Sequence, residues 1–214
     1  MSREVSVVEN GQKGLGVLEA VYGKVISGVH PLSEPLEKFA EEYIRQADGD
    51  KEKAVDDMVS NQVAKLATTG FLTGLGGLIT LPVSIPADIT TGLYVQMRMI
   101  CAIAYMRGYD IQSDAVKTLV YTSLVGLKIV DLVKQVGLKA SEKIALNMLK
   151  KLPGHILVKI NQKIGFRFLT KFGQKGLVNI WKVIPVVPGI VNAAWNAVET
   201  KAVAERAKKN FCGQ

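Results

Sequence analysis

Apolar side chains recur every three or four residues along most of this chain, which is the period of one buried face of an α-helix. The first such stripe extends from Leu15 to Val29, and His30-Pro31 follows it. Because a proline disfavours the helical conformation of the residue before it, the first helix is expected to end there. No run of alternating β-branched residues is long enough to predict a sheet. The pattern therefore predicts an all-α fold, arranged as a single compact helical bundle.

Two more apolar stripes follow, over residues 36–44 and 54–66. Ser33 is the expected N-cap of the first and Asp50 that of the second, because short polar side chains accept hydrogen bonds from the free N–H groups of a first helical turn. A helix is then expected from Pro86 to Arg107, closed by Gly108, and another from Ser113 to about Val136. Proline and glycine positions predict further helices over 139–151, 156–172, 174–184 and 189–210.

One segment departs from this pattern, since residues 66–87 carry no charge. Its length of 22 residues matches the roughly 20 apolar residues that span a bilayer core. Glycines and prolines interrupt it, so we expect a glycine-rich apolar helical hairpin near 66–107 in which small residues let helices approach closely. The segment could insert into lipid or form the core. The interrupting residues include Gly70, Gly74, Gly76, Gly77, Pro82 and Pro86.

Asp88 ends the uncharged segment. A buried carboxylate must be paired or hydrogen-bonded, so Asp88 could belong to a pocket together with Thr91, Gln96 and Arg98 on the following helix. Alternatively, Asp88 simply stabilises the positive end of that helix.

The net charge of +8 is unevenly distributed. Residues 1–110 hold 10 basic and 14 acidic side chains, whereas residues 111–214 hold 17 basic and 5 acidic ones. Such a basic half favours an anionic partner, such as lipid headgroups, or forms a solvated face that keeps the protein in solution. The sequence contains no nucleic-acid recognition module, which disfavours nucleic acid as the partner.

The sharpest basic pattern advances in steps of four residues: Lys159, Lys163, Arg167, Lys171 and Lys175. Each step turns about 40° around a helix, so these side chains form a slowly winding basic stripe. Ile160, Ile164, Phe168 and Phe172 run beside it and predict an apolar border of the kind that interfacial helices place on anionic lipid. The alternative is an ordinary bundle helix with a basic outer face. Gly165 and Gly173 are expected to weaken one continuous helix here.

Catalytic and metal-binding patterns are sparse. The two histidines, His30 and His155, lack the spacing of a metal site, and no nucleophile motif occurs. Cys101 lies in an apolar run, and with Cys212 it is expected to be a reduced thiol. No cofactor, metal or catalytic residue is therefore predicted, although an unrecognised hydrolase stays open as an alternative.

Two stretches resemble the EcsC family of bacterial helical proteins. The first is TGFLTGLGGLITLPVSIPADITTGLYVQMRMICAIAYMRGYD (69–110) and the second is IPVVPGIVNAAWNAVETKAVAERAKKNF (184–211). The resemblance implies an N-terminal helical extension over 1–32 and an EcsC-like all-helical domain over 33–214. It also places the family signature at Gly74, Gly76, Gly77, Pro82, Pro86, Asp88, Gln96 and Gly108.

Together, these features predict a non-enzymatic, cytoplasmic protein that is peripheral to the inner membrane. Its basic surface would meet anionic membrane lipid or a membrane protein. The alternative is a soluble helical domain that binds an apolar ligand or a protein partner in a pocket near Asp88.

Overall fold

Every regular element in the described part of the chain is an α-helix. The computed structural model describes the backbone of residues 2–67, 87–135, 137, 149, 151–172 and 190–212. An isolated β-bridge joins Val29 to Ser33, and no strand occurs in these ranges. The helices are α1 (Ser2–Ser27), α2 (Leu36–Gln46), α3 (Lys51–Ala67), α5 (Ala87–Met106), α6 (Asp114–Val125), α7 (Ile129–Gln135), α9 (Gly154–Phe172) and α11 (Ile190–Asn210). They pack into a compact bundle, which confirms the predicted fold class.

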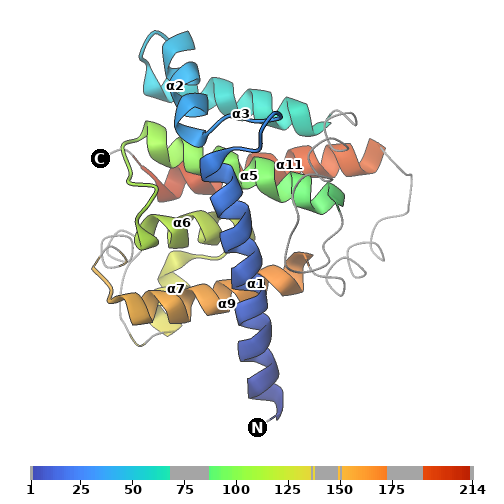
Figure 1. The fold of residues 1–214 in the computed structure, drawn as a ribbon, viewed down its shortest axis with the longest axis vertical. Helices are drawn as coiled ribbons and strands as arrows, with labels where there is room; N and C mark the ends of the chain where they lie inside the picture. The colour runs from blue at the N-terminus through green and yellow to red at the C-terminus, as the bar shows by residue number, and fades with distance from the viewer. Residues whose placement is uncertain are drawn as a thin grey trace.

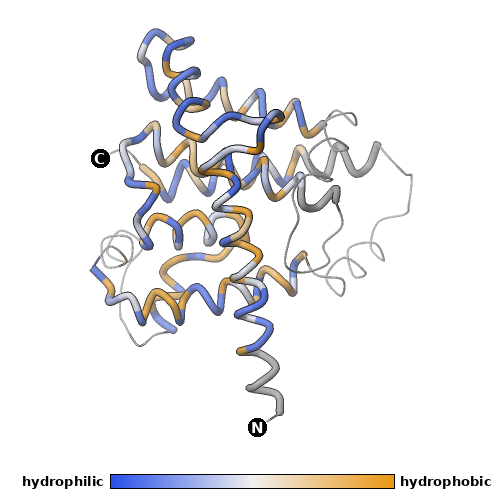
Figure 2. Tube along the Cα trace, viewed as in Figure 1, coloured by the Kyte–Doolittle hydropathy of each residue, from blue (hydrophilic) through white to orange (hydrophobic). Residues whose placement is uncertain are grey.

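Helix α5 lies at the centre of this bundle and contacts α1, α2, α3, α6 and α11. Its side chains Met97, Ile100 and Ile103 are fully buried. Each buried side chain of this size contributes about 1.5–3 kcal/mol relative to exposure. Figure 1 shows α5 and α11 at one level of the view, α6 below them and α9 below α6, with α1 running across them. In Figure 2, hydrophilic residues prevail at the turn between α2 and α3, at the edge of the molecule.

Several helix ends match the predictions. Asp50 Oδ1 accepts hydrogen bonds of 3.0 Å from the backbone N–H groups of both Glu52 and Lys53, as an N-cap does. Ser113 Oγ accepts one of 3.2 Å from the N–H of Val116 at the start of α6. Gly108 follows α5 with a φ of +81°, a left-handed conformation that favours glycine.

The prediction for Ser33 was wrong. Helix α2 begins at Leu36 with Pro35 in the N-cap position and no side-chain cap. Ser33 Oγ instead accepts a 2.9 Å hydrogen bond from the N–H of Val29, and it lies 2.5 Å from the hydroxyl of Tyr94. Ser33 therefore closes the tight turn after α1 and fastens that turn to α5.

The single helix predicted from Ser113 to Val136 was also wrong, because two helices occupy that range. Gly126 ends α6 with a φ of +77°, and its N–H donates to the carbonyl of Thr122. Helix α7 begins at Ile129. A left-handed glycine lets the chain change direction at no steric cost, so the apolar pattern continues while the helix does not.

Glycines allow two helices to approach closely where α1 crosses α9. A Cβ atom added at Gly11, Gly14 or Gly165 would lie closer than 3.0 Å to the backbone of the opposite helix. Helix α9 continues through Gly165 to Phe172, contrary to the expected weakening. The packing gained at this crossing offsets the low helix propensity of glycine.

The glycine-rich hairpin falls largely outside the described residues, which include only its second arm, α5. The proposed boundary at residue 32 stays a prediction. Helix α1 contributes Val17, Leu18 and Val21 to the same hydrophobic core as the later helices.

Candidate functional site

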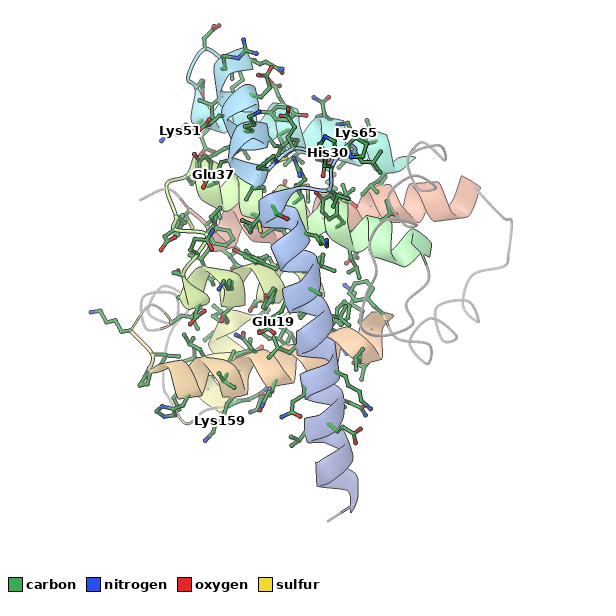
Figure 3. The ribbon with its side chains drawn as sticks, in the orientation of Figure 1. Glu19, His30, Glu37, Lys51, Lys65 and Lys159 are labelled. Atoms are coloured by element: carbon green, nitrogen blue, oxygen red, sulfur yellow. The ribbon has the colours of Figure 1, made fainter. Side chains whose placement is uncertain are left out.

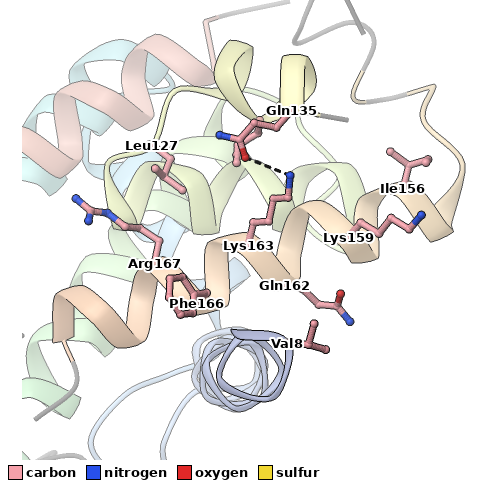
Figure 4. Close-up of a pocket in the computed structure, with 10 residues that line it drawn as sticks. Val8, Leu127, Gln135, Ile156, Lys159, Gln162, Lys163, Phe166 and Arg167 are labelled. Atoms are coloured by element: carbon pink, nitrogen blue, oxygen red, sulfur yellow. Dashed lines mark hydrogen bonds between the residues drawn. The ribbon is translucent and has the colours of Figure 1, made fainter. Parts of the chain in front are cut away.

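Three residues of the predicted basic stripe line one groove beside α9. Lys159, Lys163 and Arg167 face a cavity of about 730 Å³ between α1, α7 and α9 (Figure 4). The other lining residues are Val8, Leu127, Leu132, Gln135, Ile156, Gln162 and Phe166. We call this cavity the basic groove.

The charged wall of the basic groove is all of one sign. Its three cationic side chains are exposed, and no Asp or Glu is among the described residues that line the cavity. Lys163 Nζ donates a 3.2 Å hydrogen bond to Gln135 Oε1 on α7, which holds the ammonium group across the groove. Nothing in the described lining neutralises these charges, so they attract anions.

The remainder of the groove is mainly apolar. Leu132 is buried, whereas Leu127, Ile156 and Phe166 are half-buried. Val8 on α1 is 52% exposed, and it forms the wall opposite α7 (Figure 4). Apolar surface next to unneutralised cations suits a ligand that has both an anionic and an apolar part.

Two local sequence features shape the groove. The glycine crossing places α1 directly on α9, with Gly11 against the backbone of Gln162, a lining residue. The turn at Gly126 then sends the short helix α7 over the other side of α9. The groove is the space that stays open between α1 and α7 on α9, because the glycine crossing positions α1 and the turn at Gly126 positions α7.

The aromatic border predicted for the stripe was wrong. Ile160, Ile164 and Phe168 are fully buried and belong to the core. Phe166 and Ile156 are the apolar residues of α9 that line the groove. Phe166 lies three positions after Lys163, so the i, i+3 spacing could have identified it as a neighbour.

Lys171, the fourth residue of the stripe, does not line the groove. Lys171 Nζ forms an ion pair of 2.7 Å with Glu199 of α11. From Lys159 to Lys171 the stripe turns by about 120° in three steps, which explains why Lys171 faces a different helix. Lys175 lies outside the described residues.

Most of the family signature is also outside the described part of the chain, which leaves out Gly74, Gly76, Gly77, Pro82 and Pro86. Asp88 lies in the first turn of α5, but its side chain is not among those described. Gly108 ends that helix, as described above.

Gln96 and Arg98 do not meet, although both are buried on α5. Gln96 Nε2 donates a 3.1 Å hydrogen bond to Thr200 Oγ1 of α11. Arg98 Nη1 donates one of 2.8 Å to the hydroxyl of Tyr94, and its guanidinium lies 4.3 Å from the ring centre of Phe39 on α2. Residues two apart point to different sides of a helix, so these two side chains join α5 to different neighbours.

Two arginines near the C-terminal end of α11, Arg206 on α11 and Arg107 just after α5, donate hydrogen bonds to backbone carbonyls at helix ends. Arg206 Nε donates a 2.9 Å hydrogen bond to the carbonyl of Ser123 in the last turn of α6. Arg107 Nη1 donates to the carbonyls of Lys208 and Phe211, at 2.7 and 2.8 Å, where α11 ends. Carbonyls of a last helical turn lack partners within the helix, so these arginines satisfy acceptors that would otherwise need water.

A second cavity, of about 430 Å³, lies on another side of α1. Glu19, Asp114, Lys117 and Tyr121 are among its lining residues. Burial raises the pKa of the Tyr121 hydroxyl, and the negative charge of Glu19 adds to the rise. The lining of this cavity has charges of both signs, whereas the charged side chains in the described lining of the basic groove are all positive.

Thiol and metal chemistry find little support in the described residues. Cys101 and Cys212 are both free, as predicted, and burial raises the pKa of the Cys101 thiol. No group of three or more His, Cys, Asp or Glu side chains in the described ranges is arranged to hold a metal ion. Of the helices described, none combines the length and the apolar character that crossing a membrane requires.

Comparison of the chain with protein-family models, with curated proteins and with solved structures finds no match. The resemblance to the EcsC family therefore stays a prediction.

Proposed function

We propose that this protein is a non-enzymatic, membrane-associated helical protein that binds anionic lipid at the cytoplasmic face of the inner membrane. The observation that carries the proposal is the basic groove, where Lys159, Lys163 and Arg167 lie beside apolar side chains with no carboxylate in the described lining. Each basic residue near an anionic membrane contributes about 1 kcal/mol, so the three together favour binding by about 3 kcal/mol.

The test is flotation of the full chain with liposomes. Wild-type protein is expected to float with vesicles that contain anionic phosphatidylglycerol and to stay at the bottom with purely zwitterionic vesicles. Raising the salt from about 0.1 M to about 1 M shortens the Debye length from about 10 Å to about 3 Å and should release the protein.

A charge-reversed variant tests the groove itself. The triple substitution Lys159→Glu, Lys163→Glu and Arg167→Glu should lower vesicle binding by at least about a hundredfold, because loss of the three attractions alone is equivalent to about 3 kcal/mol. The matched control is Lys24→Glu, Lys51→Glu and Lys201→Glu, which changes the net charge equally at exposed positions outside the groove. Figure 3 shows Lys51 at the opposite end of the molecule from Lys159.

The control variant is expected to float as wild type does. Equal loss in both variants would mean that overall charge, and not the groove, governs binding. Wild-type protein that stays at the bottom with every vesicle would overturn the proposed function.

A further inference from the structure

We infer that the basic groove binds one molecule of a single-chain anionic lipid, with a phosphate headgroup at the cationic wall and an acyl chain along the apolar wall. This inference rests on the proposed function and deepens it, since a membrane surface can hold a basic protein without any lipid entering a cavity. It commits the site to a ligand class, the monoacyl lipids whose phosphate headgroup carries a net negative charge.

The headgroup position follows from the spacing of the cations. Lys159, Lys163 and Arg167 are separated by steps of about 6 Å along the axis of α9. Lys163 is the central one, and its bond to Gln135 keeps the ammonium group over the cavity (Figure 4). A phosphate beside Lys163 would have a further cation on either side, and a lysine ammonium is a common phosphate ligand in proteins.

The chain position follows from the apolar lining. Leu127 and Phe166 lie near Arg167 at one end of the groove, and Ile156 lies near Lys159 at the other (Figure 4). Val8, from a different helix, faces the groove from the side of α1. Covering this surface with an acyl chain gains about 0.8 kcal/mol for each CH₂ group that is buried.

The size of the groove favours one chain. Its volume of about 730 Å³ is within the range of about 300–1,000 Å³ that is usual for small-molecule sites. A monoacyl lipid is a ligand of that size, whereas a diacyl phospholipid is larger. The charge, the apolar lining and the volume therefore agree on one ligand class.

Calorimetric titration of the full chain tests this inference with three probes below their micelle concentrations. Palmitoyl lysophosphatidic acid has both parts, palmitoyl lysophosphatidylcholine keeps the chain but is zwitterionic, and glycerol 3-phosphate lacks the chain. The first is expected to bind with a stoichiometry of one, at least about tenfold tighter than either of the others. Equal affinity of the two palmitoyl lipids, or of glycerol 3-phosphate and lysophosphatidic acid, would overturn the inference.

A blocking substitution tests whether the ligand enters the groove. Val8→Trp places an indole ring in the groove while it keeps every cation, so it should abolish lysophosphatidic acid binding, and vesicle flotation of the same variant is measured alongside. Val198→Trp is the matched control, because Val198 is 67% exposed on α11, outside the groove. It should change neither property, and circular dichroism checks that both variants keep their helices.

Each remaining outcome overturns the inference, alone or together with the proposed function. Flotation of the wild-type protein without lysophosphatidic acid binding, or equal effects of the two tryptophans, would leave a surface-binding protein with no lipid site in the groove. Absence of both flotation and lysophosphatidic acid binding would remove the proposed function together with the inference.

Discussion

Helices α9 and α11 are both rich in basic residues, but the fold uses them differently. On α11, Lys208 pairs with Asp56 of α3 at 2.6 Å, and Arg206 donates a 2.9 Å hydrogen bond to the carbonyl of Ser123 of α6. On α9, Lys159 and Arg167 have no acidic partner among the described residues, and the ammonium group of Lys163 donates a hydrogen bond to the neutral amide of Gln135. The same residue types therefore join helices in one region and line an open groove in the other.

This difference teaches that a surplus of positive charge in the sequence does not by itself locate a binding surface. The charge of a cation that contacts a carboxylate or a helix-end carbonyl is partly neutralised, and the hydrogen bonds of that cation stabilise the fold. A cation that contacts neither group is not neutralised, so its electrostatic field can attract an anionic ligand. The acidic first half of the chain supplies Glu52 and Asp56, which pair with Arg107 and Lys208 beside the end of α11.

The largest expected effect concerns the glycine crossing that forms the groove. Gly14→Ala should lower the free energy of unfolding by about 1–3 kcal/mol, because its Cβ would overlap the backbone of Gly165. Gly16→Ala is the control, since nothing lies within 4 Å of that Cβ, and it should raise stability by up to about 1 kcal/mol. Urea unfolding measures both, and equal changes would contradict the close crossing.

A smaller effect compares one arginine from each helix. Arg206→Gln removes the donor to the carbonyl of Ser123 and should cost about 1–2 kcal/mol of unfolding free energy. Arg167→Gln should change the unfolding free energy by less than about 0.5 kcal/mol, because the Arg167 guanidinium is exposed and has no acidic partner among the described residues. Thermal unfolding at matched ionic strength compares the two, and a greater loss in Arg167→Gln would reverse the roles assigned to the two helices.

The smallest effect concerns Lys171, which lies on α9 but pairs with α11. A double-mutant cycle of Lys171→Gln with Glu199→Gln should give a coupling energy of about 0.5–1 kcal/mol, as expected for a partly buried ion pair. The same cycle with Lys159→Gln should give no measurable coupling. Coupling of equal size at Lys159 would mean that the groove lysine also serves the fold.

The helix caps and the groove show which structural features could be predicted from the sequence and which could not. Asp50 and Ser113 could be identified as caps because their effect is local and involves N–H groups two or three residues away. Ser33 does not follow the same rule, because its partners include Tyr94, 61 residues further along the chain. The groove could be predicted only in part, since the spacing identified its cations but gave no sign of Val8 or Leu127.

The sequence by itself determined the helical class of the fold, a helix that follows Pro86 and the recurrence of basic residues along α9, because these depend on interactions within a few residues along the chain. Only the tertiary structure decided which basic residues stay open to a ligand. That outcome depends on where Gly11, Gly14 and Gly165 let α1 cross α9 and on where the turn at Gly126 directs α7. Contacts between residues far apart in sequence set the positions of α1 and α7, and a local sequence pattern does not predict such contacts.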